Sequence, residues 1–329
     1  MNPATKGNIR QGQRVYYSPR YIASIGDHIM PIHKFALVQE GIEATTLPVR
    51  FETPEPISDD DLLRVHTREY LDAIATGEPI ALAQSQKFPW SPQLADAVRW
   101  TNGGTVEAAF AALEDGVAGN LASGFHHSHA AYGEGFCTFN GLVIALEKLR
   151  AQGRVRRGLI LDMDLHYGNG TASLLESRPW AHQLSIYGNW YKKNLAYRDV
   201  TAERAPDTAN CVSVPVPAGA KGFEYLDILN SSLPAAIIRS NPDILLYQAG
   251  ADPYREDPYS PLDLGHEDLR ARDEAVFEMA RRAGIPVMWV LAGGYTKDTS
   301  KVVEVHVNTF RAAHQVFATR PSVPGVPRS

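Results

Sequence analysis

Three side chains that can bind a cation follow an apolar segment at alternate positions. The sequence LILDMDLHYGNGT, residues 159–171, starts with apolar residues and continues with Asp162, Asp164 and His166. Side chains two residues apart in an extended chain point the same way, so Asp164 and His166 can converge on one ion. Asp252, in YQAGADP after another apolar segment, is the natural third ligand. One aspartate alone would more often cap a helix, but three protein ligands with a position left open for water and substrate are typical of a catalytic zinc.

Two adjacent histidines, His126 and His127, lie in the segment SGFHHSHAAYGEGFC, residues 123–137. A lone histidine is more often a core residue than a catalyst, whereas a tandem pair offers a general base and a second imidazole beside one water. The first segment holds two further polar residues that can orient them, Asp162 and Asn169. A carboxylate favours the protonated imidazole, while an amide fixes the tautomer without adding charge. If Asp162 serves His126 and Asn169 serves His127, then His127 stays neutral near pH 7 and is the better base.

A tyrosine follows two glycines in LAGGYTKD, residues 291–298. Gly293 and Gly294 allow a sharp turn or a close approach of the backbone to a ligand, and they place Tyr295 at the edge of the same site. A phenol there can donate a hydrogen bond to an oxygen that becomes negative during a reaction. Such a sequence is common in loops, so this assignment of Tyr295 depends on the presence of the other motifs.

The segments that precede these residues have the pattern of buried strands. Apolar runs predict strands at residues 14–17, 118–123, 158–164, 182–188, 242–250 and 285–294. Runs without alternation indicate strands that are covered on both faces. Between them lie amphipathic segments such as residues 265–284, a predicted helix with Gly284 at its C-terminal end. This alternation predicts an α/β fold with a parallel sheet, whose ligands bind outside the carboxyl ends of the strands, where the chemical motifs lie.

The composition predicts one large domain. The 329 residues are 44% hydrophobic and 21% charged, which is typical of a globular protein with a large core. No linker divides the chain, so we expect one catalytic domain over residues 1–318. Residues 319–329, rich in Pro, Ser and Gly, are expected to be a flexible tail.

Charge and patterning exclude several classes of partner. The net charge is −5 and the basic residues are scattered, which argues against a nucleic-acid partner. The N-terminus lacks the apolar core of a signal peptide, and no stretch reaches the roughly 18 apolar residues of a membrane span. Two cysteines, Cys137 and Cys211, cannot build a disulfide framework. We therefore expect a cytoplasmic protein without a membrane partner, while its oligomeric state stays open.

Four motifs together resemble those of the zinc-dependent histone deacetylases. GFHHSHAAYGEGFC, DMDLHYGNG, QAGAD and GGY occur in that family's order and near its spacing. The resemblance runs from residue 15 to about residue 306 and is greatest for the class IV branch, which includes bacterial members. It implies the arginase/deacetylase fold, a single α/β domain with a central parallel sheet of about eight strands flanked by helices.

The resemblance also implies roles for individual residues. Zinc would be held by Asp164, His166 and Asp252. The catalytic set would be the tandem pair His126 and His127, their partners Asp162 and Asn169, and Tyr295 as the phenol that polarises the substrate carbonyl. The substrate tunnel would be lined by Gly135 and Phe136, with Gly293 and Gly294 also facing substrate and Trp190 or Tyr191 as the second wall. A structural potassium ion would be held by Asp162, Asp164, His166, Ser185 and the Ile186 carbonyl. Asn169 departs from the pattern, because many members of the family have Asp there.

These parts predict a zinc-dependent deacylase that acts on N-acyl-lysine, with a metal-activated water, the tandem histidines as acid and base, and Tyr295 as oxyanion donor. An arginase-like site with two manganese ions would need further carboxylates at positions that hold Gly168 and Tyr254. A small-molecule amidohydrolase, such as an acetylpolyamine deacetylase, would use the same zinc site, and acidic residues in YREDPY, residues 254–259, would favour it. A non-catalytic acyl-lysine binder would be expected to have lost a ligand or Tyr295.

Overall fold

The computed structural model of this chain describes residues 12–189 and 207–318. The expected tail, residues 319–329, lies outside these ranges, as do Trp190 and Tyr191, so those predictions stay open. None of the described helices has both the length and the apolar character that a membrane crossing requires.

The described residues form one eight-stranded sheet in which every pair of neighbouring strands is parallel. The order across the sheet is β2-β1-β3-β8-β7-β4-β5-β6. The strands are β1 (Gln13–Tyr16), β2 (Val49–Glu52), β3 (Val117–Ser123), β4 (Gly158–Asp162), β5 (Ala181–Tyr187), β6 (Cys211–Pro215), β7 (Ile244–Ala249) and β8 (Val287–Leu291). The predicted α/β fold with a parallel sheet is therefore confirmed, and the sheet has the size that the resemblance implies.

The two strands that the apolar runs did not predict lie at the two edges of the sheet. β2 has the sequence VRFE and none of its residues is fully buried. β6 has the sequence CVSVP and is only partly buried. An edge strand has a neighbour on one side only and is often short and polar, so it lacks the continuous apolar run of a central strand.

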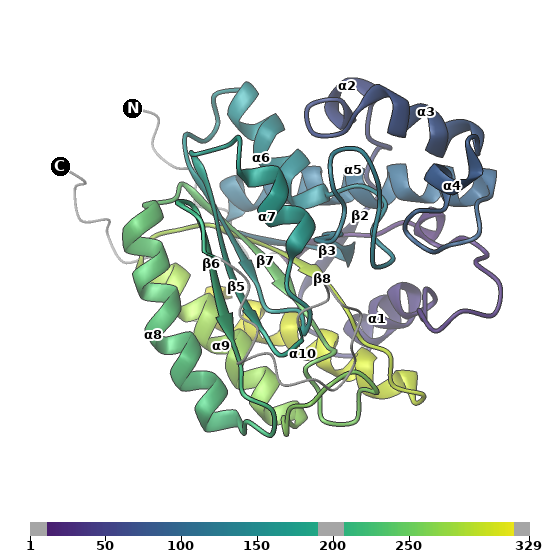
Figure 1. Ribbon diagram of the computed structural model, residues 1–329. Coiled ribbons are helices and arrows are strands. Elements are labelled where there is room, and N and C mark those ends of the chain that lie inside the picture. Colours follow the sequence, from purple (N-terminus) through teal and green to yellow (C-terminus); the bar gives the residue numbers. More distant parts are fainter. Residues whose placement is uncertain (1–11, 190–206, 319–329) are drawn as a thin grey trace.

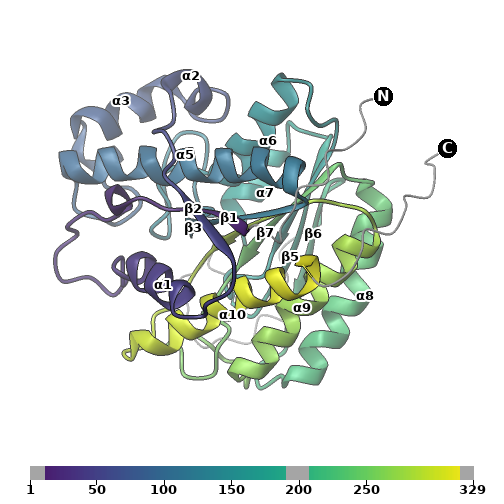
Figure 2. The same ribbon diagram turned by 180° about the vertical axis from the view of Figure 1, so that it is seen from behind.

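Helices cover both faces of the sheet (Figure 1 and Figure 2). One face is covered by α1 (Lys34–Glu43), α8 (Gly222–Ser240), α9 (His266–Arg282) and α10 (Thr299–Ala318). The other is covered by α5 (Pro92–Asp115), α6 (Gly141–Ala151) and α7 (Asn169–Leu175). The remaining short helices are η2 (Pro19–Tyr21), α2 (Asp59–Leu62), α3 (Arg68–Thr76) and α4 (Ile80–Ala83). The chain thus forms three layers, with the parallel sheet in the middle.

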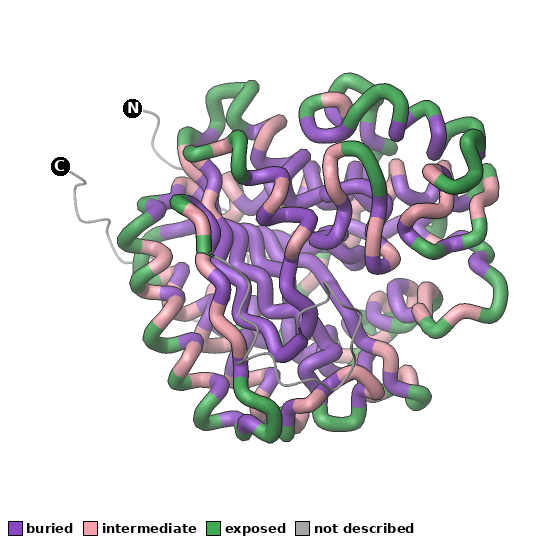
Figure 3. The backbone as a smooth tube through the Cα atoms, in the orientation of Figure 1, coloured by how far each residue is buried: buried purple, intermediate pink, exposed green. Residues whose placement is uncertain are grey.

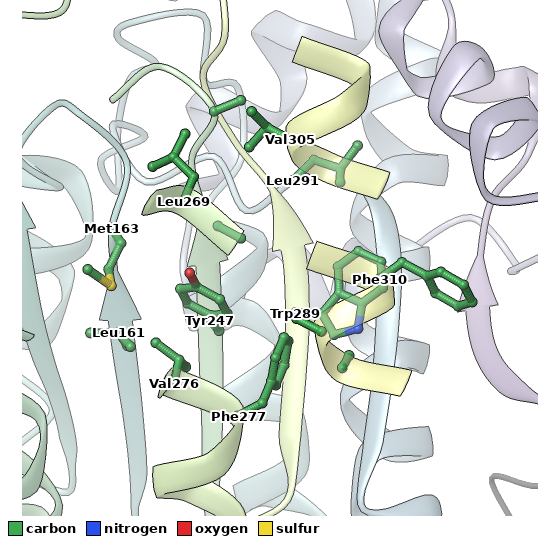
Figure 4. Close-up of a cluster of buried hydrophobic side chains, with 14 of the residues drawn as sticks. Leu161, Met163, Tyr247, Leu269, Val276, Phe277, Trp289, Leu291, Val305 and Phe310 are labelled. Atoms are coloured by element: carbon green, nitrogen blue, oxygen red, sulfur yellow. The ribbon is translucent and has the colours of Figure 1, made fainter. Parts of the chain in front are cut away.

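Each central strand contributes side chains to two cores. Tyr247 and Trp289 belong to the core beneath α9 and α10, together with Phe277 and Phe310 (Figure 4). Their chain neighbours Leu246 and Met288 belong to the core beneath α5 and α6. Successive side chains of a strand point to opposite faces, so a strand between two helical layers must be apolar at every position. Figure 3 shows the resulting buried centre of the sheet.

The predicted helix over residues 265–284 is confirmed as α9. Its first turn is capped by Asp268, whose Oδ2 accepts a hydrogen bond of 2.7 Å from the Gly265 N–H. It ends at Arg282, and Gly284 follows with a φ of +68°. A left-handed glycine just after the last turn is a common helix terminator because the conformation costs glycine no side-chain clash.

The order of the strands brings the chemical motifs together. The four adjacent strands β3, β8, β7 and β4 are followed in the chain by the tandem histidines, the GGY segment, Asp252 and the Asp164 segment, respectively. Since all four strands run in the same direction, their carboxyl ends meet at one edge. Residues more than a hundred positions apart therefore share one site.

Candidate active site at the carboxyl edge of the sheet

The three predicted metal ligands are within reach of one ion. Each of Asp164, His166 and Asp252 offers one ligand atom, and these atoms all lie within 4.8 Å of one another. His166 Nδ1 is 3.1 Å from Asp164 Oδ1 and 3.1 Å from Asp252 Oδ2. The three side chains are 4%, 11% and 0% exposed, respectively. Carboxylate oxygens and imidazole nitrogens are donors that zinc binds in sites with three protein ligands.

The electrostatics of this cluster fit a cation. Burial and the charge of Asp164 raise the pKa of Asp252 to about 7. Burial lowers the pKa of His166, but hydrogen bonds to Asp164 and Asp252 outweigh it and raise that pKa to about 10. The two buried carboxylates therefore require a positive charge between them, which a protonated imidazole or a divalent cation can supply. A zinc ion would meet this requirement through the same three donor atoms.

Backbone N–H groups fix the orientation of the Asp164 and Asp252 carboxylates. Leu165 donates to Asp252 Oδ1 at 2.9 Å, and Gly293 donates to Asp164 Oδ2 at 2.7 Å. A Cβ atom at position 293 would lie 1.9 Å from Asp252 Oδ2, so only glycine lets the backbone approach this closely. Gly293 thus supports the metal ligands directly, while a Cβ at Gly294 would meet Val302 of α10 at 2.7 Å.

The tandem histidines have the two partners that the sequence suggests for them. His126 Nδ1 lies 2.7 Å from Asp162 Oδ2, and His127 Nδ1 lies 2.6 Å from Asn169 Oδ1. The ring centroids of His126 and His127 are 3.9 Å apart, and the His127 and His166 centroids are 6.0 Å apart. His126 Nε2 lies 3.7 Å from Asp164 Oδ1, so the two rings lie beside the candidate metal ligands while each Nδ1 is bound to its own partner.

The two imidazoles differ in charge. Burial and the nearby imidazoles of His126 and His166 lower the pKa of His127 well below its usual value. Burial also lowers the pKa of His126, but the charges of Asp162 and Asp164 outweigh it and raise that pKa. His127 is consequently the neutral imidazole, able to accept a proton, and His126 is the one that favours the charged form.

Tyr295 stands beside the metal ligands as a neutral phenol. Its ring centroid is 6.5 Å from that of His166. Burial, together with the charges of Asp164 and Asp252, raises the pKa of Tyr295 well above its usual value. The phenol therefore keeps its proton and can donate it in a hydrogen bond to a developing oxyanion.

Asp257 holds the loops around this phenol, although the sequence pattern assigned it only to an acidic rim. Its Oδ2 accepts from the Tyr295 backbone N–H at 2.7 Å, and its Oδ1 accepts from the Tyr259 backbone N–H at 3.0 Å. Asp257 is 3% exposed, and burial raises its pKa to about 6. It is therefore a buried anchor of two loops rather than a surface charge.

Aromatic side chains surround the approach to the metal ligands. Phe136 lies 6.2 Å from Tyr295, 4.7 Å from His28 and 5.6 Å from Phe88, measured between ring centroids. The ring centroid of Tyr259 lies 5.3 Å from that of Tyr295 and 6.0 Å from that of His166. Motif patterns identify Phe136 but neither Tyr259 nor Phe88, because a lone aromatic residue in a loop has no distinguishing spacing.

Gly135, the other predicted tunnel residue, packs against the base. A Cβ at this position would lie 2.4 Å from His127 Cδ2, and its φ is +53°. Glycine is required on both counts. Gly135 therefore packs directly against the His127 ring, and the next residue, Phe136, reaches Tyr295.

A buried ammonium lies beneath the site. Lys34 is 0% exposed, and its Nζ donates to the Ala292 carbonyl at 2.6 Å. Burial lowers its pKa to about 8, against the opposing charges of Asp252 and Asp164. Its Nζ also stands 6.0 Å from the Tyr295 ring centroid. Nothing in the local sequence marks this lysine, since its neighbours are those of an ordinary helix start.

The residues predicted for potassium occupy adjacent strands. Asp162 at the end of β4 pairs in register with Ser185 of β5, and Ile186 follows it. All three are buried, at 0%, 0% and 1% exposure. The arrangement brings Asp162 and Ser185 to the same edge of the sheet as the candidate metal ligands.

His66 anchors the loop that carries the tandem histidines. Its Nδ1 lies 2.9 Å from the His129 carbonyl oxygen, and its Nε2 accepts a hydrogen bond of 3.0 Å from the Asn140 N–H. Nδ1 must then carry the proton and Nε2 must be free of one, so the neutral ring meets both needs. Burial lowers the pKa of His66 to about 4. A lone histidine 60 positions before the motif gives no sequence signal of this role.

The low pKa of His66 predicts that the folded protein loses stability in acid. Because the folded-state pKa is below the ordinary 6.5, the contribution of neutral His66 is complete above pH 6.5 and is lost as the pH falls toward 4. Linkage gives a loss of about 2 kcal/mol between pH 7 and pH 5. We expect the stability advantage of the wild type over His66→Gln, measured by urea unfolding, to shrink by that amount. An equal advantage at both pH values would contradict the assignment.

Several known proteins are similar to this chain in sequence or in fold. The profile of the family described as the histone deacetylase domain matches residues 28–310. Histone deacetylase 2 of Arabidopsis thaliana is 30% identical over 275 residues, which cover 82% of this chain and 69% of that protein. Acetylpolyamine amidohydrolase 1 of Pseudomonas aeruginosa is 31% identical over 188 residues, 55% of this chain and 51% of that protein. The crystal structure of the HDA15 HD domain has the same fold, with a TM-score of 0.76 at 21% identity over 94% of this chain and 91% of that one.

Proposed function

Because this chain belongs to the histone deacetylase family, we propose that it is a zinc-dependent hydrolase that removes the acyl group from N-acyl-lysine. The observation that carries the proposal is the meeting of three elements in one buried site. These are the cluster of Asp164, His166 and Asp252, the tandem histidines, and the neutral phenol of Tyr295. Together they provide an ion site, a base and an oxyanion donor for the hydrolysis of an amide.

The metal has a limited and defined part in this scheme. Held by Asp164, His166 and Asp252, zinc would act as a Lewis acid toward the substrate carbonyl and lower the pKa of a water. His127, neutral and hydrogen-bonded through Nδ1 to Asn169, accepts the proton of that water at Nε2. Tyr295 donates its phenol proton in a hydrogen bond to the oxygen that becomes negative.

The leaving amine needs a proton in the second half of the reaction. The proton that His127 has taken up is available for this transfer, and the bond between carbonyl carbon and nitrogen then breaks to give a carboxylate and a free amine. His126, held by Asp162 at 2.7 Å, favours its charged form and so adds positive charge near the oxyanion. The two histidines thus act as a proton carrier and an electrostatic partner.

The walls of the approach favour a linear substrate arm. Phe136 and Tyr259 offer aromatic surface next to Tyr295, which suits the apolar methylenes of an acylated lysine. The acidic groups that would draw a polyamine are already engaged. Glu256 is paired with Lys301 and the Tyr254 hydroxyl, and Asp257 is buried. A lysine peptide is therefore the proposed substrate, although one relative is named an acetylpolyamine amidohydrolase.

We also propose a potassium ion beside the zinc. The support is the register pairing of Asp162 with Ser185, two buried residues with oxygen-bearing side chains on adjacent strands. Within residues 12–189 and 207–318, the charged or chargeable partner recorded for Asp162 is His126. Oxygen donors of this kind suit a hard cation. Its role would be to balance the charge of Asp162 and hold the strand ends in place.

Replacing the phenol tests the oxyanion role. Tyr295→Phe keeps the ring contacts with His166 and Tyr259 but removes the donor. We expect kcat to fall by about 10² to 10³, the usual effect of losing one oxyanion donor, while zinc content stays the same. Steady-state kinetics with an acetyl-lysine peptide measure this. Phe88→Leu, which changes an aromatic residue of the same approach without touching the donor, is the matched control, and an unchanged rate in Tyr295→Phe would remove the phenol from the mechanism.

The function itself is tested with a substrate panel. Zinc-loaded protein is assayed for release of the free amine from acetyl-, octanoyl- and myristoyl-lysine peptides and from acetylputrescine and acetylspermidine. Turnover of the peptides is expected and would also reveal the preferred chain length. Turnover of the polyamines alone would move the protein to small-molecule metabolism. Zinc binding without any turnover would overturn the hydrolase proposal in favour of an acyl-lysine binder.

A further inference from the structure

The amide of Asn169 is held in one orientation from both ends. Its Oδ1 is 2.6 Å from His127 Nδ1, and its Nδ2 donates to Glu134 Oε2 at 2.7 Å. A carboxylate only accepts hydrogen bonds, so the NH₂ end of the amide must face Glu134 and the oxygen must face His127. The oxygen can in turn only accept, so the proton of neutral His127 sits on Nδ1 and its Nε2 is left to act as base.

Glu134 is itself held in place. His129 Nε2 lies 3.4 Å from Glu134 Oε2, and the His129 ring stacks on Tyr132 at a centroid distance of 4.5 Å. Ser173 Oγ donates to the Gly170 carbonyl at 2.8 Å and lies 2.7 Å from His129 Nδ1, so it contacts the ring on the side away from Glu134. The hydrogen bond from His129, together with that from Asn169, lowers the pKa of Glu134. Glu134 therefore remains an ionised acceptor although its side chain is 34% exposed.

We propose that Glu134 is a positioning residue that fixes the amide of Asn169 and, through it, the tautomer of His127. This inference rests on the proposed role of His127 as the base. Removal of Glu134 would leave the Asn169 Nδ2 with only its 3.3 Å contact to His129 Nε2. The amide could then turn and place an NH₂ group against the imidazole N–H, which stabilises the wrong tautomer. The arrangement keeps a full negative charge one side chain away from the base, where it orients the ring without strongly favouring its protonated form.

The test exchanges the carboxylate of Glu134 and the amide of Asn169, so that donor and acceptor change places between the two positions. Asn169→Asp places two carboxylates 2.7 Å apart in the wild-type geometry and should lower kcat by about 10-fold to 100-fold, the usual cost of losing a partner that orients an active-site group. Glu134→Leu should have a similar cost, and Glu134→Gln a smaller one because its carbonyl can still accept. In the double variant Glu134→Gln/Asn169→Asp, the new amide donates to the new carboxylate, and that carboxylate accepts from His127.

Rescue is the expected result. The double variant should recover at least about tenfold in kcat over Asn169→Asp alone, with KM nearly unchanged, because orientation of a base acts on the chemical step. Glu176→Leu, which removes an exposed glutamate at the end of the same helix α7, is the control and should match the wild type. If the two single effects on kcat simply multiply in the double variant, there is no rescue, and the positioning role would be overturned.

A second measurement does not depend on turnover. The Nδ1–H proton of His127, hydrogen-bonded to Asn169, should give a downfield proton NMR signal that His127→Phe lacks. We expect Glu134→Leu to lose or shift this signal and Glu134→Gln to keep it. Retention of an unshifted signal in Glu134→Leu would contradict the positioning role. A wild type that shows the signal and its loss in Glu134→Leu but has no turnover would instead contradict the proposed function.

Discussion

Asp252→Ala is expected to abolish both zinc binding and turnover. Asp252 is fully buried, supplies one of three donor atoms that lie within 4.8 Å of one another, and has its second oxygen held by the Leu165 N–H. Its loss removes a ligand and half of the negative charge that the cation would balance. Since the metal is worth several kcal/mol of transition-state stabilisation, the rate should fall by about 10³ or more.

Metal content and kinetics must be measured on the same preparation. Elemental analysis should give one zinc for each wild-type chain and much less for Asp252→Ala. Asp252→Asn keeps an oxygen for the Leu165 N–H while removing the charge, so it separates loss of the ion from loss of the backbone contact. Asp263→Ala, which removes an exposed aspartate of the same loop, is the control. Full zinc occupancy with normal turnover in both Asp252 variants would rule out this metal site.

His127→Phe is the second large effect that we expect. The imidazole is kept neutral by burial and by the neighbouring His126 and His166, and its Nδ1 is engaged with Asn169. A neutral imidazole protonated at Nδ1 accepts a proton at Nε2, and general-base catalysis of this kind is usually worth 10²-fold to 10⁴-fold. Turnover should fall by about that factor while zinc content remains that of the wild type, because the ring is not a metal ligand.

The comparison of two histidines sharpens this prediction. His126→Phe removes the positive charge near the oxyanion and the hydrogen bond to Asp162, but it leaves the base in place, so its effect on turnover should be smaller. His182→Gln, at the start of β5 and remote from the metal ligands in the fold, controls for the loss of any partly buried imidazole. A wild-type rate in His127→Phe would show that another group takes the proton, and a larger loss in His126→Phe would exchange the two roles.

The polar residues that carry chemistry could be identified from their spacing. Asp164 and His166 are two apart after a buried strand, the tandem histidines follow another, and Asp162 and Asn169 are within three residues of the metal ligands. Local spacing is enough here because a strand end and the turn after it fix the direction of each side chain. Central strands were equally clear, since burial on both faces demands a continuous apolar run.

Sequence patterns did not predict the edge strands or the residues that support the site from distant segments. β2 and β6 have no continuous apolar run because a strand at an edge is only partly covered. Lys34 contacts the Ala292 carbonyl 258 positions away, and His66 contacts Asn140 74 positions away. Each is a single residue in an unremarkable segment, so its role depends entirely on which distant backbone group it meets.

By itself, the sequence determined the family, the parallel α/β architecture, and the types of residue available as ligands, base and phenol. Only the tertiary structure decided that β3, β8, β7 and β4 are neighbours, which brings the four motifs to one edge. It also decided that Asp257 is a buried anchor, that Phe136 and Tyr259 both contact the ring of Tyr295, and that Glu134 reaches Asn169. The physical reason is that spacing along a chain controls the direction of neighbouring side chains. The packing of helices on the sheet decides instead which distant polar groups are buried side by side, and those groups must then hydrogen-bond to one another.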